Sequence, residues 1–75
     1  MQVEQFRKVN QAEPFKPYTI HLADGRMFTV RHPEFVAISP QGRSIAVVAD
    51  DGTFDMIDLL LVTSLHVGNG QAASS

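Results

Sequence analysis

Residues 18–32 read Tyr-Thr-Ile-His-Leu-Ala-Asp-Gly-Arg-Met-Phe-Thr-Val-Arg-His and contain two alternating apolar runs that meet at a glycine. Such alternation is typical of two β-strands with one buried face, because successive side chains of a strand point to opposite faces. The Asp-Gly step between the runs predicts the turn of a β-hairpin. We therefore expect a fold organised around an antiparallel hairpin.

The length of this turn determines which residues face each other. A two-residue loop would oppose apolar to polar side chains across the hairpin. A three-residue loop, with Gly25 in the left-handed position of a bulge, places Ile20 opposite Phe28 and Tyr18 opposite Val30. We therefore predict the three-residue loop, which keeps the apolar side chains of both strands on one face.

The same arrangement of turn residues recurs twice. Gly42 ends Pro-Gln-Gly and Gly52 ends Asp-Asp-Gly, so both are predicted to close three-residue turns in the way that Gly25 does. The turns separate predicted strands at residues 35–39, 43–49 and from residue 53 onward. At the third turn, a three-residue loop places Val48 opposite Phe54, which again pairs two apolar side chains.

The two ends of the chain are predicted to differ from its middle. Residues 1–13 place Val3, Phe6 and Val9 at helical spacing, and the proline at position 14 stops the helix. About a dozen residues barely overcome helix nucleation, so this helix must pack on the sheet. Residues 68–75 have no apolar anchor and are predicted to form a flexible tail.

The segment 53–67 is too long for one strand in a small domain and must bend. Asp58 is placed to cap a short helical turn at Leu59 and Leu60. A last strand over residues 61–67 follows. One face of this strand is expected to hold Leu61, Thr63, Leu65 and Val67.

The run Ile-His-Leu-Ala-Asp-Gly-Arg-Met-Phe at residues 20–28 resembles the first motif of the Sm and Sm-like (LSm) proteins. That resemblance implies an N-terminal helix on a strongly bent five-stranded barrel, which agrees with the predicted element order. We predict a mainly β fold with one N-terminal helix, in which residues 18–67 form a small five-stranded antiparallel Sm-like or SH3-like barrel. The single domain is expected to span residues 1–67.

Two stretches depart from the motifs with which Sm proteins hold a base. Residues 34–39 read Glu-Phe-Val-Ala-Ile-Ser where that family has Asp-x-apolar-Asn. Residues 57–60 read Ile-Asp-Leu-Leu where the family has Ile-Arg-Gly followed by Asp or Asn. The uridine-binding residues of the family therefore do not carry over.

A second resemblance covers nearly the whole chain as far as residue 67. The combination of Pro-Phe-Lys-Pro-Tyr, Leu-Ala-Asp-Gly-Arg, His-Pro-Glu-Phe-Val and Ile-Asp-Leu-Leu-Leu-Val-Thr looks like a group of short uncharacterised bacterial proteins. That group has no assigned activity, so the resemblance implies no function.

Length and composition narrow the range of functions. A core in a chain of 75 residues gives only about 3–5 kcal/mol of net stability, and the absence of cysteine excludes disulfides and thiolate metal sites. The formal charge of −2 provides no general attraction to nucleic acid or anionic membranes. No signal peptide or membrane span is apparent, so we expect a cytoplasmic protein without a membrane partner.

The leading functional hypothesis is a non-enzymatic binding or scaffold module that forms homo-oligomers through its edge strands. Its motivation is more apolar surface near the end of the chain than five strands and a helix can cover. The predicted interface consists of Leu59, Leu60, Leu61, Val62 and Leu65. No catalytic residue and no cofactor is assigned.

Two alternatives remain open. The first is binding of RNA or single-stranded DNA through Arg26, Arg31 and Arg43, with Tyr18 available for stacking on bases. The second is a metal-binding protein that uses its histidines. The three histidines match no compact ligand spacing, so no metal ligand is assigned: His21, His32 and His66.

Overall fold

The computed structural model describes residues 1–68, which form one helix, six strands and two 3₁₀ turns. In chain order these elements are α1 (Val3–Asn10), β1 (Tyr18–Leu22), β2 (Met27–Val30), η1 (Pro33–Phe35), β3 (Val36–Ile38), β4 (Ser44–Val48), β5 (Phe54–Asp58), η2 (Leu59–Leu61) and β6 (Val62–Val67). The mainly β fold with one N-terminal helix is confirmed. The predicted tail begins at Gly68, and its residues 69–75 lie outside the described residues.

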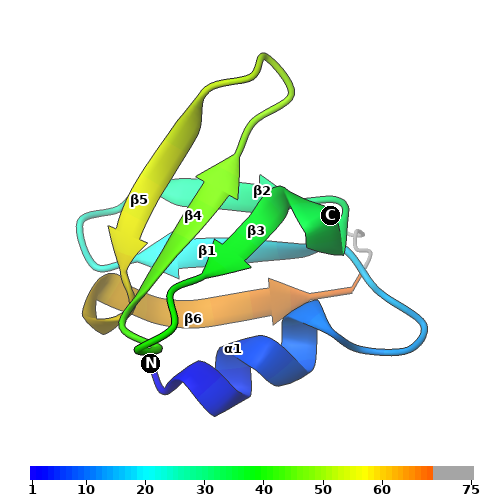
Figure 1. Ribbon diagram of the computed structural model, residues 1–75, viewed down its shortest axis with the longest axis horizontal. Coiled ribbons are helices and arrows are strands. Elements are labelled where there is room, and N and C mark those ends of the chain that lie inside the picture. Colours follow the sequence, from blue (N-terminus) through cyan, green and yellow to red (C-terminus); the bar gives the residue numbers. More distant parts are fainter. Residues whose placement is uncertain (69–75) are drawn as a thin grey trace.

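The strands form two antiparallel sheets of three strands each, ordered β2–β1–β6 and β3–β4–β5. Figure 1 shows β4 and β5 running across the strands of the other sheet, with α1 below β6. The prediction of one five-stranded barrel is therefore corrected, because the structure has six strands in two open three-stranded sheets. Pro33 has no amide hydrogen to continue a ladder and begins η1, which separates β2 in one sheet from β3 in the other.

The first and third turns have the predicted register. Ile20 pairs with Phe28 and Tyr18 with Val30 in the first hairpin. Val48 pairs with Phe54 in the third. The glycine of each turn has the left-handed backbone that the three-residue loop requires, with φ of 92° at Gly25 and 90° at Gly52.

The second turn is one residue longer than predicted. The amide of Ser39 donates to the carbonyl of Ser44, so four residues separate the paired ends instead of three. The Ser39 hydroxyl oxygen accepts from the amides of both Arg43 and Ser44, at 3.2 Å each, and this side chain holds the extra residue in place. The longer loop pairs Ile38 with Ile45 and keeps both strands in apolar register.

The helix is shorter than the predicted range 1–13 and spans Val3–Asn10. Phe6 is fully buried, as its helical position suggested, whereas Val3 and Val9 are half-buried. Asn10 is also buried. Its side-chain oxygen accepts a hydrogen bond of 2.7 Å from the Tyr18 hydroxyl, which satisfies this polar group in the core. The helix therefore ends at Asn10, whose side chain lies in the core.

One core lies between the helix and the two sheets. It consists of Phe6, Tyr18, Ile20, Leu22, Val30, Ile45, Val47, Ile57, Leu59 and Val62. The inward residues alternate along β1 and β4 as expected for strands with one buried face.

The last strand differs from its predicted pattern because of a bulge. His21 pairs with Ser64 but Leu22 pairs with Val62, so Thr63 is an extra residue on β6. The inward face therefore changes at Thr63: Val62 is buried, whereas Leu61 belongs to η2 and is exposed. The predicted cap of this turn is confirmed, since the Asp58 carboxylate accepts from the Leu60 amide at 2.9 Å.

Candidate binding surface

Tyr18, the residue predicted to stack on nucleic acid, is 2% exposed. Its ring packs against Phe6 and Phe15 in edge-to-face arrangements with centroid distances of 5.9 and 6.1 Å. Burial raises the pKa of the Tyr18 phenol well above its ordinary value, because the phenolate would lose its hydration. Tyr18 is therefore a core residue and presents no face to a base.

The three candidate arginines do not form one basic patch. Arg26 and Arg31 lie at opposite ends of β2, about 16 Å apart at a rise of about 3.3 Å per residue. Arg26 pairs with Asp24 at 2.8 Å, and Arg31 pairs with Asp50 at 3.0 Å. The Arg26 amide and then its side chain donate to Asp24, which lowers the pKa of that carboxyl.

Arg43 lies in the second turn and is exposed. It lines a cavity of about 300 Å³ together with Gly42, Asp58 and Leu60. Tyr18 is buried and both Arg26 and Arg31 pair with carboxylates, whereas Arg43 is exposed, so nucleic-acid binding stays a prediction without a shared site for these residues.

The histidines lie on two parts of the fold. The register of β1 and β6 places His21 and His66 on the same outer face of the first sheet, where His66 pairs with Thr19. His32 lies before η1 and packs edge-to-face on Phe35, with a centroid distance of 5.2 Å. Within residues 1–68, no group of three or more His, Cys, Asp or Glu side chains is placed to hold a metal ion.

The predicted leucine interface is divided between core and surface. Leu59 and Val62 are 2% and 4% exposed, so these two are packing residues and cannot contact a partner. The 3₁₀ turn η2 causes this, because it rotates its first residue inward. Leu65 is partly buried against the core, and only Leu60 and Leu61 are exposed.

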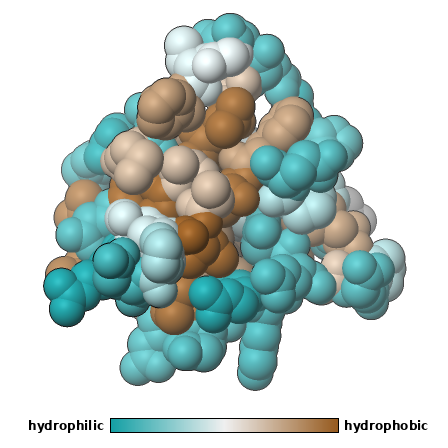
Figure 2. All heavy atoms as spheres, viewed as in Figure 1, coloured by the Kyte–Doolittle hydropathy of each residue, from teal (hydrophilic) through white to brown (hydrophobic). Residues whose placement is uncertain are grey.

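A second apolar surface, which the sequence did not reveal, covers the outer face of the β3–β4–β5 sheet. We call it the sheet patch and define it as Ala37, Ala46, Val48, Phe54 and Met56. The register pairs Ala46 with both Ala37 and Met56, and Val48 with Phe54, so the patch runs across all three strands. Figure 2 shows it as the brown area over these strands. Phe54 and Met56 are 61% and 64% exposed.

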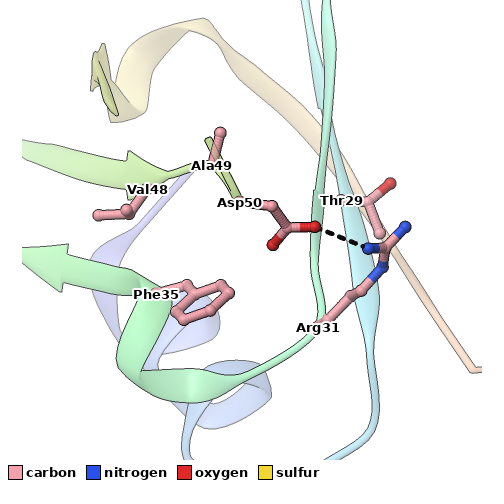
Figure 3. A pocket seen from close by; sticks show the side chains of 6 residues that line it. All are labelled: Thr29, Arg31, Phe35, Val48, Ala49 and Asp50. Carbon is pink, nitrogen blue, oxygen red and sulfur yellow. Dashed lines mark hydrogen bonds and ion pairs between the residues drawn. The ribbon is translucent and has the colours of Figure 1, made fainter. Parts of the chain in front are cut away.

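A cavity of about 170 Å³ adjoins the sheet patch at Val48. Figure 3 shows Phe35, Val48 and Ala49 around it, with the ion pair of Arg31 and Asp50 across its mouth. Both side chains of this pair are largely exposed, so the pair contributes little to stability. The cavity is apolar on the side of Phe35, Val48 and Ala49 and polar on the side of Thr29, Arg31 and Asp50.

The charges on the β4–β5 hairpin itself, residues 44–58, are all negative. Every lysine and arginine of the chain lies at or before position 43, whereas residues 44–68 contain four aspartates: Asp50, Asp51, Asp55 and Asp58. The Thr53 hydroxyl and then its amide donate to Asp51, which lowers the pKa of that carboxyl and keeps it ionised. The β4–β5 hairpin is therefore an acidic element with an apolar face.

Comparisons with protein-family models, with curated proteins and with solved structures found no match. Within the described part of the chain, no helix has the length and apolar character needed to cross a membrane. The geometry of the described residues is therefore the basis for the candidate binding surface.

Proposed function

We propose that the chain is a non-enzymatic interaction module that associates with copies of itself through the sheet patch. The observation that carries this proposal is the row of exposed apolar side chains across a three-stranded sheet, led by Phe54 and Met56. Contiguous apolar surface of this kind marks interaction sites in proteins. Association also adds buried apolar area to a domain whose own core is small.

For the fold, we propose an open barrel of the Sm-like or SH3-like kind. In this arrangement β2, η1 and β3 together take the place of one bent strand. The order β6–β1–β2 in one sheet and β3–β4–β5 in the other supports it, as do the N-terminal helix and the 3₁₀ turn before the last strand.

Two sheets that pack face to face lie about 10 Å apart, and the side chains of their facing surfaces fill the space between them. The sheet patch suits this contact, because its members are apolar and its central residue, Ala46, is small. A contact between identical patches closes about a two-fold axis and gives a dimer. We therefore expect a dimer as the smallest assembly.

Met56 and Met27 provide a matched pair of variants to test the proposal. They are 64% and 62% exposed, but Met56 lies in the sheet patch and Met27 lies on the other sheet. In sedimentation velocity at micromolar concentrations, we expect dimers for the natural sequence and for Met27→Asp. Met56→Asp should weaken association at least tenfold, since it buries an unpaired carboxylate in the contact.

A third variant separates the sheet patch from the leucine surface. Leu60 is 85% exposed and is the middle residue of η2, the turn that directly follows β5. If Leu60→Asp dissociates the dimer and Met56→Asp does not, the contact lies at η2 and the sheet patch is the wrong surface. A natural sequence that stays monomeric up to hundreds of micromolar contradicts self-association altogether.

A further inference from the structure

We propose that the free edge of β5 binds a basic, extended segment of a partner protein as an additional strand. This inference goes beyond self-association, because it depends on the backbone edge and the aspartates of β5 and not on the face of the sheet alone. Strand addition at an exposed edge is a common way for a domain to recognise a peptide.

The backbone of β5 is open on one side. Phe54–Asp58 pairs with β4 over its whole length, from Ser44 opposite Asp58 to Val48 opposite Phe54, without a bulge. No strand within residues 1–68 pairs with its other side. Proteins guard such edges with charged side chains, proline or a bulge. The strand β5 reads Phe-Asp-Met-Ile-Asp and has neither proline nor a bulge, but its two aspartates disfavour an added strand that lacks cations. The edge is therefore regular, and it is open to an added strand that carries cations.

The charge of β5 decides which kind of strand fits. Asp55 and Asp58 take part in no ion pair within the described residues. Antiparallel pairing of β5 with the same strand of a second copy would bring four carboxylates together, and β5 itself has no cation to offset them. The other edge strands, β2, β3 and β6, contain no lysine or arginine either, and the two arginines that flank β2 already pair with Asp24 and Asp50. Charge complementarity therefore favours a partner segment rich in Lys or Arg over another copy of this chain.

The alternation of β5 specifies the order of side chains in that segment. Phe54, Met56 and Asp58 share the outer face, and Asp55 and Ile57 share the other. In an antiparallel added strand, each side chain lies on the same face as the residue opposite it. Apolar residues opposite Met56 and Phe54, and cations opposite Asp58 and Asp55, give the sequence Lys-x-apolar-Lys-apolar, read from the amino end.

A pair of labelled peptides tests this inference. The first is Ser-Lys-Thr-Val-Lys-Val-Ser with blocked ends, and the second has glutamate in place of both lysines. In fluorescence anisotropy at low salt, we expect the lysine peptide to bind at least tenfold more tightly than the glutamate peptide, and added salt should weaken it. The variant Asp55→Lys should lose the lysine peptide and gain affinity for the glutamate peptide.

The location of the peptide is measured by amide chemical shifts in NMR. We expect the largest changes at residues 54–58 and not along β3, the opposite edge of the same sheet. Equal affinity for the two peptides, no binding up to millimolar concentration, or shifts confined to another element would each overturn the inference. Because Asp55 lies outside the sheet patch, sedimentation of Asp55→Lys shows separately whether self-association holds.

Discussion

Tyr18 joins three parts of the molecule that are distant in the sequence. Its hydroxyl donates to Asn10 at the end of α1, and the Asn10 amide donates to the carbonyl of Pro33 at 3.3 Å. The tyrosine itself begins β1. Helix, sheet and the bend at η1 are therefore held together by two consecutive hydrogen bonds, the first buried and the second partly buried. An unpaired polar group in such a setting is costly.

The raised pKa of Tyr18 predicts a loss of stability in alkali. An exposed tyrosine ionises near pH 10.0, and the folded protein holds its phenol neutral beyond that value. The free energy of unfolding is therefore fully present below pH 10 and should fall as the pH rises above it. Urea titrations at increasing pH measure this fall, and tyrosinate absorbance of the folded protein should appear only at higher pH than in the denatured chain.

The variant Tyr18→Phe is the control for this prediction. It should be less stable at neutral pH by about 1–3 kcal/mol, because Asn10 loses its buried partner. Its stability should then depend much less on pH in the alkaline range. Ionisation of the folded natural protein near pH 10 would contradict the role assigned to burial.

Among the elements, the second turn carries a constraint that the other turns lack. Gly42 has φ of 71°, and a Cβ atom added there would lie 3.0 Å from Cγ1 of Val3 in the helix. Gly25 has a similar left-handed backbone with φ of 92°, but its added Cβ would meet open space. The second turn therefore serves as a surface on which α1 packs.

Replacing each glycine by alanine separates backbone strain from this contact. Gly25→Ala should cost about 1–2 kcal/mol, which is the cost of a left-handed backbone for a residue with a Cβ. Gly42→Ala should cost about 1 kcal/mol more, since Val3 must also move. Urea midpoints of the two variants measure the difference. Equal losses would show that the helix does not rest on the turn.

The elements also show how far sequence reasoning reaches. Two hairpin registers were predictable, because apolar alternation and a glycine together allow only one turn length. The second turn was not, because the Ser39 hydroxyl replaces a ladder partner and holds an additional residue. The bulge at Thr63 was hidden for a similar reason, since its hydroxyl donates to the His21 carbonyl. In both cases a side chain forms a hydrogen bond with the backbone, and the hydropathy pattern of the sequence does not reveal such a bond.

For the whole molecule, the sequence placed two core residues, Leu59 and Val62, on the surface and did not reveal the sheet patch. Leu59 and Val62 belong to a continuous apolar run, but η2 turns both inward. The sheet patch was missed because both faces of β4 and β5 are largely apolar, so alternation does not identify the outer one. The one available signal was side-chain size. Ser44 and Ala46 lie on the outer face of β4 and are smaller than Ile45 and Val47 on its inner face.

Phe6 and Phe54 provide a test of where the stability of the whole domain resides. Phe6 is fully buried in the single core, and Phe54 is largely exposed in the sheet patch. Phe6→Ala should cost about 3–5 kcal/mol, which is comparable with the total for a domain of this size, and should leave the chain mostly unfolded. Phe54→Ala should change the stability of the monomer by less than about 1 kcal/mol. Thermal melts followed by circular dichroism, at concentrations low enough to avoid association, measure both.

The position of Tyr18 also gives the molecule an optical reporter. The chain has one tyrosine and no tryptophan, so its intrinsic fluorescence comes almost entirely from this ring at the junction of α1 and β1. Detachment of the helix would free the hydroxyl from Asn10 and admit water to the ring while the strands stay paired. In rapid mixing, a change of emission that precedes the loss of the strand signal would therefore time the opening of the helix separately from global unfolding.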